Sequence, residues 1–337
     1  MHQIGLIVNP AAGKDIRRLV AYGSVFGNRE KISYTIRMLM GLASTVGEPV
    51  RVFYMPDPYD LVGIARDEIR SRCLSLELLA APIPVLGDEA DTLSFTEWAV
   101  REGVEAFLVL GGDGTNRLVA KRSESVPLFS VSGGTNNVFA HAVEPTIAGM
   151  ALGFFLAGWV ATSEVIERSK VLRCTMLKGE FEKGQKEDLA LVDLVLVETD
   201  VSGTRAIWEP ELVKLVMVTQ SSVLSIGLSA VIGRIVPIAP QEKRGAYAEL
   251  GVPGRRVKVP LAPGLVKEVS VRRFDFLEMG REIVLEHERG ILALDGEREL
   301  PVRKGEAWKV VLEETGPLRA NIERIMSLTR ERGVYDG

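Results

Sequence analysis

Cysteine and histidine are scarce in this chain of 337 residues, which contains two cysteines and three histidines. Cys73 and Cys174 lie far apart, and no histidine stands at a metal-ligand spacing from either of them. A zinc site and a disulfide framework are therefore both disfavoured. An excess of positive charge is also absent, because 41 basic and 45 acidic residues are interspersed to a net charge of −4. A nucleic-acid partner is thus not expected, and any phosphate recognition must be local.

We expect no signal peptide, because a strand-like run, QIGLIVN, begins at residue 3. We therefore expect a reducing, cytoplasmic location, which also suits the low cysteine content. One uncharged stretch, residues 146–163, lies at the short limit for a membrane span. Pro145 precedes it, and proline favours the first turn of a helix. We interpret the stretch as a helix buried between domains and expect no stable membrane insertion.

Apolar strands alternate with helical patterns over residues 1–145. This alternation predicts an α/β domain with a doubly wound, largely parallel sheet and helices on both faces. Ligands of such sheets bind at the carboxyl ends of the strands. The expected strands cover residues 4–8, 49–55, 77–86, 106–110 and 127–132, and the expected helices cover residues 32–45, 59–72 and 93–102.

A different pattern follows, in which short strands succeed one another with tight turns and no intervening helices. It predicts a mostly antiparallel, β-sandwich-like domain over residues 146–314, entered through the apolar helix. Residues 315–337 have a helical period and are expected to form a C-terminal helix that packs back on the molecule. The expected strands of this domain cover residues 190–198, 212–220, 269–277, 282–288, 291–302 and 308–314.

The most informative segment is GGDGTN, residues 111–116, which follows an apolar strand and precedes a helical pattern. Glycine lets the backbone approach a ligand closely, and a helix that begins near Asn116 directs N–H groups towards a phosphate. Asp113 is unusual there, because a carboxylate repels an anion unless it holds a metal ion or takes a proton from an attacking hydroxyl. The segment therefore predicts a phosphate-binding loop that contains one chemically active acid.

Three further loops stand at the ends of predicted strands. IVNPAAGKD (7–15) is either a strand-ending turn or a second part of the site. SVSGGTNNVFAH (130–141) fits a helix N-cap, which explains its threonine but hardly both glycines and both asparagines. LDGERE (294–299) is read first as a β-hairpin turn, because Asp-Gly between alternating strands strongly favours one. The sequence contains neither a G-x-G-x-x-G dinucleotide fingerprint nor a P-loop, so phosphates must be held in another way.

Together these motifs resemble the superfamily of NAD kinases, diacylglycerol kinases and sphingosine kinases. The pattern is most similar to the ATP-NAD kinase-like branch called acetoin-catabolism protein X, on the segments VNPAAGKDIRRLVAYGSVFGNREK, VLGGDGTNRLVAK and SGGTNNVFAHAVEPTIAGMALG. The resemblance implies a nucleotide-binding α/β domain, a β-rich substrate domain and an active site in the cleft. It also implies phosphorylation of a hydroxyl by ATP with Mg²⁺.

The resemblance further implies roles for individual residues. Asp113 acts on the acceptor hydroxyl or on its Mg²⁺. Asp193 stands near the place of the Asn-Glu pair with which NAD kinases bind the adenosine ribose, and is the candidate acceptor ligand; residues 221–238 resemble, more distantly, a glycine- and serine-rich stretch of those enzymes. The late loop can contribute Asp295, Gly296 and Glu297. The candidates for binding nucleotide phosphates are Asn9, Gly13, Gly111, Gly112, Gly114, Thr115, Asn116, Gly134, Thr135, Asn136 and Asn137.

We therefore expect a kinase that transfers the γ-phosphoryl group of ATP to the adenosine ribose 2′-hydroxyl of NAD, giving NADP. Two alternatives stay open. One is a lipid or sphingoid-base kinase, which the NPAAGK and GGTNN segments favour, and the other is a nucleotide-binding regulator without catalysis. The expected partners are small molecules, ATP and NAD, and the chain is expected to form a homo-oligomer.

Overall fold

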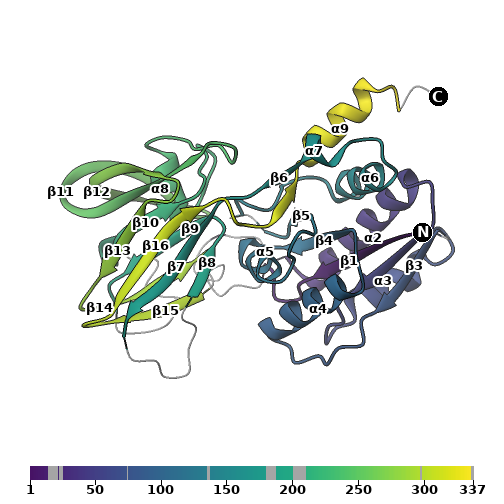
Figure 1. The fold of residues 1–337 in the computed structure, drawn as a ribbon, viewed down its shortest axis with the longest axis horizontal. Helices are drawn as coiled ribbons and strands as arrows, with labels where there is room; N and C mark the ends of the chain where they lie inside the picture. The colour runs from purple at the N-terminus through teal and green to yellow at the C-terminus, as the bar shows by residue number, and fades with distance from the viewer. Residues whose placement is uncertain are drawn as a thin grey trace. The chain divides into compact units, whose positions relative to one another are not determined.

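The computed structural model describes residues 1–13, 22, 26–73, 75–134, 137–179, 187–199, 210–296 and 298–334. The chain divides into two compact units, which Figure 1 shows with their helices and strands labelled. The first unit comprises residues 1–14, 25–168 and 317–337, and the second comprises residues 15–24 and 169–316. The chain therefore returns to the first unit after it has completed the second.

The first unit is built on a seven-stranded sheet in the order β3-β2-β1-β4-β5-β17-β6. All neighbouring strands pair in parallel except β17 and β6, which pair antiparallel. Strand β4 is buried along its whole length, as expected of a parallel strand that is covered on both faces. The strands are β1 (His2–Val8), β2 (Val50–Tyr54), β3 (Leu76–Ala80), β4 (Ala106–Gly111), β5 (Leu128–Ser132), β6 (Ile166–Arg168) and β17 (Leu318–Ala320).

The helices of this unit follow the strands along the chain, which confirms the predicted α/β class. Strand β3 ends at Ala80, six residues before the expected end of that strand at residue 86. Pro82 and Pro84 lack the N–H group that a continuing ladder needs, so pairing stops before them. The helices are α2 (Asn28–Thr45), α3 (Leu61–Ile69), α4 (Glu89–Arg101), α5 (Asp113–Ala120), α6 (Pro145–Leu156), α7 (Thr162–Val165) and α9 (Ile322–Glu331).

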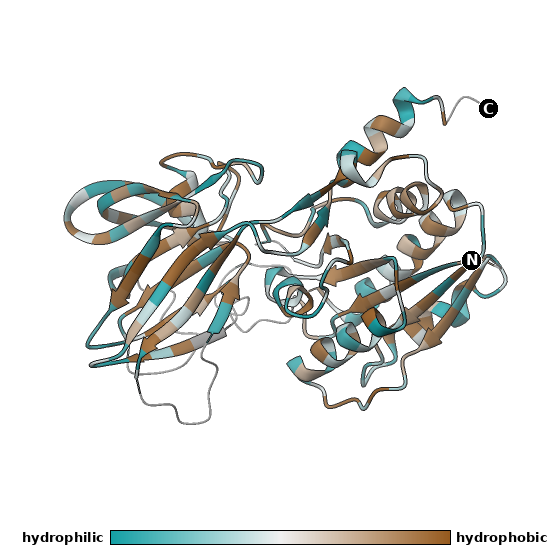
Figure 2. Cartoon of the chain, viewed as in Figure 1, coloured by the Kyte–Doolittle hydropathy of each residue, from teal (hydrophilic) through white to brown (hydrophobic). Residues whose placement is uncertain are grey.

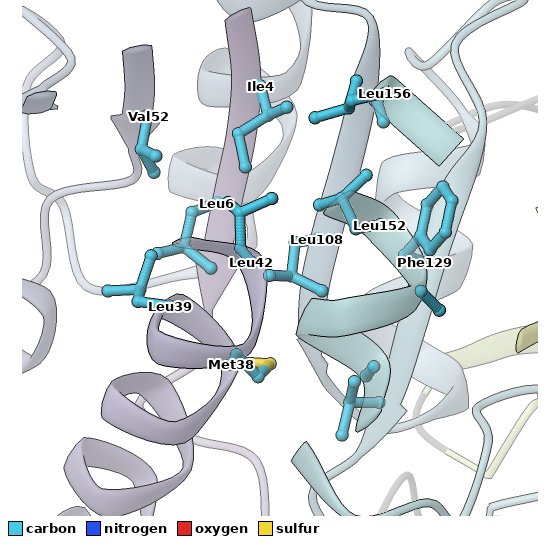
Figure 3. Packing of buried hydrophobic residues seen from close by; sticks show 14 of the residues in the cluster. Ile4, Leu6, Met38, Leu39, Leu42, Val52, Leu108, Phe129, Leu152 and Leu156 are labelled. Carbon is cyan, nitrogen blue, oxygen red and sulfur yellow. The ribbon is translucent and has the colours of Figure 1, made fainter. Parts of the chain in front are cut away.

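The uncharged stretch after residue 145 forms helix α6, which begins at Pro145 as its sequence predicts. The Glu144 carboxylate caps this helix by accepting a hydrogen bond of 2.7 Å from the N–H group of Thr146. Helix α6 packs tightly against α2, because a Cβ atom on Gly149 would lie only 1.9 Å from the carbonyl oxygen of Met38. Figure 3 shows the core beside this contact, where Leu152 and other apolar side chains of α6, α2 and the strands meet. No helix of the described residues is long and apolar enough to cross a membrane.

The second unit contains two sheets whose neighbouring strands all pair antiparallel. The six-stranded sheet has the order β12-β11-β10-β9-β14-β15, and the four-stranded sheet has the order β13-β16-β7-β8. One cluster of buried side chains around Trp308 joins residues of both sheets, and a second lies between the larger sheet and the short helix α8. This arrangement confirms the predicted antiparallel second part of the fold.

The elements of the second unit are β7 (Val171–Lys178), β8 (Glu187–Ala190), β9 (Asp193–Val197), the 3₁₀ helix η2 (Pro210–Leu212), β10 (Val213–Val218), α8 (Ser229–Gly233), β11 (Arg244–Ala262), β12 (Leu265–Glu278), β13 (Glu282–Glu286), β14 (Arg289–Leu294), β15 (Arg298–Arg303) and β16 (Ala307–Glu313).

The division into units differs from the expected boundary after residue 145. Helix α6 belongs to the first unit, so the chain crosses to the second unit after Arg168. The reason is the close packing of α6 on α2, which makes α6 part of the first core rather than a helix between domains. Residues 317–334 also belong to the first unit, where β17 joins the sheet beside β5 and α9 contacts α6.

Candidate functional site

Three loops of the first unit meet at the carboxyl edge of its parallel sheet. Because β1, β4 and β5 are neighbours in the sheet, the residues that follow them emerge side by side. The Asn9 N–H group donates a hydrogen bond of 3.1 Å to the Leu110 carbonyl oxygen. The Gly133 N–H group donates one of 3.2 Å to the carbonyl oxygen of Gly111. The structure thus brings together the loops that begin at Asn9, Gly111 and Gly133.

A side-chain hydrogen bond joins the first two of these loops. The Asn9 amide nitrogen donates to Thr115 Oγ1 over 2.8 Å, while the Asn9 amide oxygen accepts from the N–H group of Ala11 over 2.8 Å. Thr115 is buried, and a Cβ atom on Gly111 would lie 2.7 Å from its hydroxyl oxygen. A glycine at position 111 is therefore required by the packing of Thr115 against the strand end, whatever ligand the loop binds.

The loop after β1 also packs against the loop after β5. Gly13 has a φ angle of +72°, in the left-handed region that glycine adopts without strain. A Cβ atom there would lie 2.5 Å from Phe26 Cβ and 3.0 Å from the carbonyl oxygen of Gly133. Gly13 therefore lets the NPAAG segment approach the second glycine-rich loop closely.

Helix α5 begins at Asp113, three residues before the expected start near Asn116. Asn116 is buried inside the helix, where its amide nitrogen donates to the Gly112 carbonyl oxygen over 2.9 Å. Its amide oxygen accepts a hydrogen bond of 2.5 Å from the hydroxyl of Ser130 on β5. These contacts tie the start of α5 to the neighbouring strand and fix the position of Asp113.

The Asp113 carboxylate is held by the backbone of the loop that follows Asn137. Its Oδ2 atom accepts a hydrogen bond of 2.8 Å from the N–H group of Val138. Its Oδ1 atom accepts from the N–H groups of Phe139 and Ala140 over 3.0 and 3.2 Å. Asp113 therefore fixes the backbone of residues 138–140, and the same contacts fix the orientation of its carboxylate.

In the GGTNN segment, the structure describes Gly133, Gly134 and Asn137. Asn137 donates from its amide nitrogen to Ser132 Oγ over 2.7 Å, and its amide oxygen lies 3.4 Å from the N–H group of Asp113. Ser132 Oγ in turn donates to the carbonyl oxygen of Gly134 over 2.7 Å. Thr135 and Asn136, two of the expected phosphate ligands, lie outside the described residues.

Two residues that were not predicted from the sequence, Arg319 and His141, support the loop of residues 137–141. The Arg319 guanidinium stacks over the Phe139 ring at 4.9 Å from its centroid. Burial lowers the pKa of Arg319 to about 10, although the negative charges of Asp113 and Glu167 raise it. His141 Nε2 lies 3.0 Å from the carbonyl oxygen of Ala320, and burial, with the nearby charge of Arg319, lowers the pKa of His141 to about 4. A cationic Arg319 and a neutral His141 therefore support the loop at neutral pH.

Lys31 is a third residue that the sequence did not reveal. It is fully buried in the first turn of α2, and its ammonium group donates to the Pro10 carbonyl oxygen. The same charge acts on Asp57, although burial outweighs it and raises the pKa of that carboxyl group. A positive charge thus lies under the NPAAG loop. No short motif marks it, because its partners come from distant parts of the sequence.

The second unit contains a similar carboxylate arrangement at Asp295. Its Oδ2 atom accepts from the N–H group of Leu191 over 2.9 Å, and its Oδ1 atom accepts from those of Val192 and Asp193 over 2.8 and 3.2 Å. Asp295 has a φ angle of +51°, and β14 pairs with β15 around it, so the expected hairpin turn is confirmed. Gly296 continues this turn with a φ angle of +70°, whereas Glu297 lies outside the described residues.

Asp193, the candidate acceptor ligand, is the first residue of β9. Its carbonyl oxygen accepts a hydrogen bond of 2.9 Å from the N–H group of Asp295, so the two acids are adjacent in the second unit. Asp113 belongs to the first unit. The candidate residues thus form two groups, one around Asp113 and one around Asp193.

Within the described residues no group of three or more His, Cys, Asp or Glu side chains could hold a metal ion. Mg²⁺ at kinase sites is typically held by one or two carboxylates together with substrate phosphates and water. The donor set of the first unit, with one carboxylate among backbone and hydroxyl groups, fits this shared mode of binding. It does not fit a dedicated, all-protein metal site.

Comparisons with known proteins bear on the family and the fold. The family described as ATP-NAD kinase N-terminal domain matches residues 4–158, and the acetoin catabolism protein X C-terminal domain matches residues 176–315. Acetoin catabolism protein X of Cupriavidus necator is 36% identical over 304 residues, which cover 88% of this chain and 84% of that protein. The crystal structure of yeast NADH kinase complexed with NADH shares the fold, with a TM-score of 0.52 at 11% identity, covering 98% of this chain and 87% of the yeast chain.

These matches confirm the resemblance drawn from the NPAAG, GGDGT and GGTNN loops. The first match is to a kinase domain, which supports a phosphotransferase. The chain belongs to the acetoin catabolism protein X family.

Proposed function

We propose that the protein is an ATP-dependent kinase whose acceptor is the adenosine ribose 2′-hydroxyl of NAD. The observation that carries this proposal is the meeting of three glycine-rich loops at the ends of β1, β4 and β5, joined by the contact of Asn9 with Thr115. Backbone N–H groups and a helix start at such an edge suit the phosphates of a nucleotide. The match to an ATP-NAD kinase domain supports the same reaction class.

In this proposal the nucleotide phosphates lie against the backbone of residues 111–115 and of residues 133–137. Gly13 and Asn9 complete the cradle from the loop after β1. Mg²⁺, when bound with the nucleotide, neutralises charge on the phosphoryl oxygens. The protein contributes position and charge, with Lys31 placing a positive charge under the NPAAG loop.

Asp113 is the proposed general base of the reaction, and its carboxylate accepts the proton of the acceptor hydroxyl. The three backbone hydrogen bonds to its carboxylate preorganise it, because the side chain needs no reorientation when the acceptor binds. They also give Asp113 a positioning role for residues 138–140. The two roles differ in what a substitution of Asp113 changes, because loss of the base lowers turnover and loss of the hydrogen bonds lowers stability.

Asp193 is the proposed ligand of the acceptor ribose. Asp295 supports it, because the Asp295 carboxylate fixes the backbone of residues 191–193 through three hydrogen bonds. A carboxylate can accept hydrogen bonds from ribose hydroxyls, as acidic residues do in dinucleotide-binding folds. The late loop therefore contributes by orienting Asp193.

The deciding experiment is a transfer screen with radiolabelled ATP and Mg²⁺ over NAD, NADH, nucleosides, diacylglycerol and sphingosine. We expect labelled NADP from NAD. Labelled lipid without NADP would replace the proposal with a lipid kinase, the reading that the NPAAGK and GGTNN segments favour. ATP binding without transfer to any acceptor would instead identify a nucleotide-binding regulator. A parallel reaction with polyphosphate tests whether ATP is the phosphoryl donor.

A further inference from the structure

The hairpin formed by β11 and β12 differs in charge from the rest of the chain. Residues 251–273 contain six Lys or Arg residues and one Glu, whereas the whole chain has a net charge of −4. All six basic side chains are exposed. The basic residues are Arg255, Arg256, Lys258, Lys267, Arg272 and Arg273.

Three of these six basic side chains form no ion pair with the residues that the structure describes. Arg256 pairs with Glu268 over 3.2 Å, and Arg272 and Arg273 both pair with Glu249. Among the ion pairs of the described part of the chain, none involves Arg255, Lys258 or Lys267. Lys258 lies directly opposite Glu268 in the ladder, but residues 251–273 keep an excess of positive charge, which can act on an anionic partner.

Large apolar side chains are exposed around the same hairpin. Val266 is 63% exposed and pairs in register with Pro260, while Val252 is 82% exposed in the bulge of β11. Leu224 is 88% exposed in the loop before α8, and this loop is tied to the hairpin by the hydrogen bond of Gly227 N–H to the Pro260 carbonyl oxygen. Leu224 and Val266 are thus both exposed close to Pro260, and exposed apolar side chains that gather on one element are typical of an interaction surface.

The alternation of the strands explains why both kinds of side chain face outward. Val257 and Val259 on β11 are buried in the core. Lys258 lies between them and points to the other face of the hairpin, as do its cross-strand partner Glu268 and the pair formed by Pro260 and Val266. Lys267 pairs with Val259 and therefore lies on the face of the buried valines, where it is exposed near the turn of the hairpin. Figure 2 shows hydrophilic and hydrophobic segments alternating along β11 and β12. The core fixes one face, so the exposed face is rigid before any partner binds.

Tyr22 adds an aromatic group at the turn of the hairpin. Its N–H group donates to the Pro263 carbonyl oxygen over 3.1 Å, and a Cβ atom on Gly264 would lie 2.8 Å from its ring. Its side chain is itself largely exposed. Tyrosine beside lysine, arginine and aliphatic side chains is a composition typical of protein surfaces that lie at a membrane–water interface.

We propose that the β11–β12 hairpin, with the adjoining loop at residues 223–227, docks the protein on an anionic lipid surface. The basic side chains interact with the lipid headgroups, and Leu224, Val252 and Val266 enter the boundary between headgroups and acyl chains. A soluble polyanion would account for the charge but not for the exposed aliphatic side chains. This inference concerns a peripheral contact and does not depend on which acceptor the kinase uses.

The test is co-sedimentation of the full chain with vesicles. We expect binding to phosphatidylcholine mixed with phosphatidylglycerol, no binding to phosphatidylcholine alone, and loss of binding as salt is raised. The double variant Lys258→Gln/Lys267→Gln should bind about 25-fold more weakly, since each basic residue near an anionic surface contributes about fivefold. The double variant Leu224→Ser/Val266→Ser should also weaken binding, although it leaves the charge unchanged.

Matched controls separate this surface from a general effect of charge or exposed apolar area. Lys304→Gln removes an exposed lysine, and Val284→Ser removes an exposed valine, both from elsewhere in the second unit. We expect both controls to bind vesicles like the unchanged protein and all variants to keep its melting temperature. Equal weakening by the controls, or no binding to the anionic vesicles, would overturn the proposal. The proposal would also fail if the substitutions changed only self-association, which would identify a second copy of the chain as the partner. It would fail likewise if they changed only binding to single-stranded DNA, which would identify a soluble polyanion.

Discussion

The amide nitrogen of Asn9 lies 2.8 Å from the hydroxyl oxygen of Thr115, which joins the loop after β1 to the first turn of α5. Asn9→Ala removes this bond and leaves the buried Thr115 hydroxyl without that donor. We expect the free energy of unfolding to fall by about 1–3 kcal/mol, the usual cost of an unsatisfied buried polar group, and ATP to bind more weakly because the two loops lose this contact. Isothermal titration calorimetry measures the affinity of the variant for ATP. An unchanged affinity would show that the contact between these loops does not shape the nucleotide site.

Asp113→Asn tests the two roles given to this carboxylate. Whichever way the amide is turned, its NH₂ group meets a backbone N–H donor, so at least one of the three hydrogen bonds is lost. We therefore expect a lower melting temperature as well as a fall in kcat of about 10²–10⁴-fold, the usual contribution of a general base. If the melting temperature falls but more than half of the turnover remains with a confirmed acceptor, Asp113 is a positioning residue only.

Asp193→Ala tests the acceptor site independently of the nucleotide site. We expect the KM for NAD to rise by the equivalent of about 1.5–3 kcal/mol, the worth of a hydrogen bond to a charged group, with little change in the KM for ATP. Steady-state kinetics with each substrate varied in turn provides the measurement. Equal effects on both substrates would assign Asp193 to the structure of β9 instead.

Gly149→Ala tests the packing of α6 on α2. The added methyl group would lie 1.9 Å from the Met38 carbonyl oxygen, so the two helices must separate. We expect a loss of at least about 1–3 kcal/mol in the free energy of unfolding, the range for overpacked cores. Urea denaturation measures it, with the exposed Ser33→Ala on α2 as control, which should stay within about 0.5 kcal/mol. Equal stability of the two variants would contradict the close contact.

His141 predicts a pH dependence of stability. Its pKa is lowered to about 4 in the folded protein, so the unfolded chain binds the proton more readily. The contribution of neutral His141 is therefore complete above about pH 6.5 and is lost as the pH falls towards 4, at most about 3 kcal/mol for this half-buried group. His141→Gln cannot titrate, so its unfolding free energy should fall less over this range. If the unfolding free energies of the two proteins depended on pH in the same way, protonation of His141 would not be linked to stability.

Much of the first unit could be predicted, because its strands are short apolar runs and its loops carry glycine at strand ends. The hairpin turn at Asp295 was equally clear, since Asp-Gly between alternating strands has one common structural meaning. Strand β11 was not predicted, because the Gly-Val-Pro-Gly segment at residues 251–254 interrupts its alternation. The structure accommodates those residues as a bulge opposite Val271.

The candidate site was predictable only where it is local in sequence. The three loops carry visible motifs, whereas Arg319, which contacts the last of these loops, comes from far along the chain. Arg319 reaches Phe139 because β17 inserts beside β5, and a three-residue strand leaves no periodic signal. Lys31 was not predicted for a different reason, because a lysine on a helix is usually exposed to solvent.

The insertion of β17 next to β5 also sets an order of events during synthesis. Residues 317–334 are made after the whole second unit, so the first sheet gains β17 and α9 only once the intervening strands have emerged from the ribosome. Until then the apolar faces of α6 and β5 that these elements contact stay uncovered. The first unit therefore keeps part of its apolar surface exposed while the second unit is synthesised. During that time we expect chaperones and proteases to act on the first unit more than on the second.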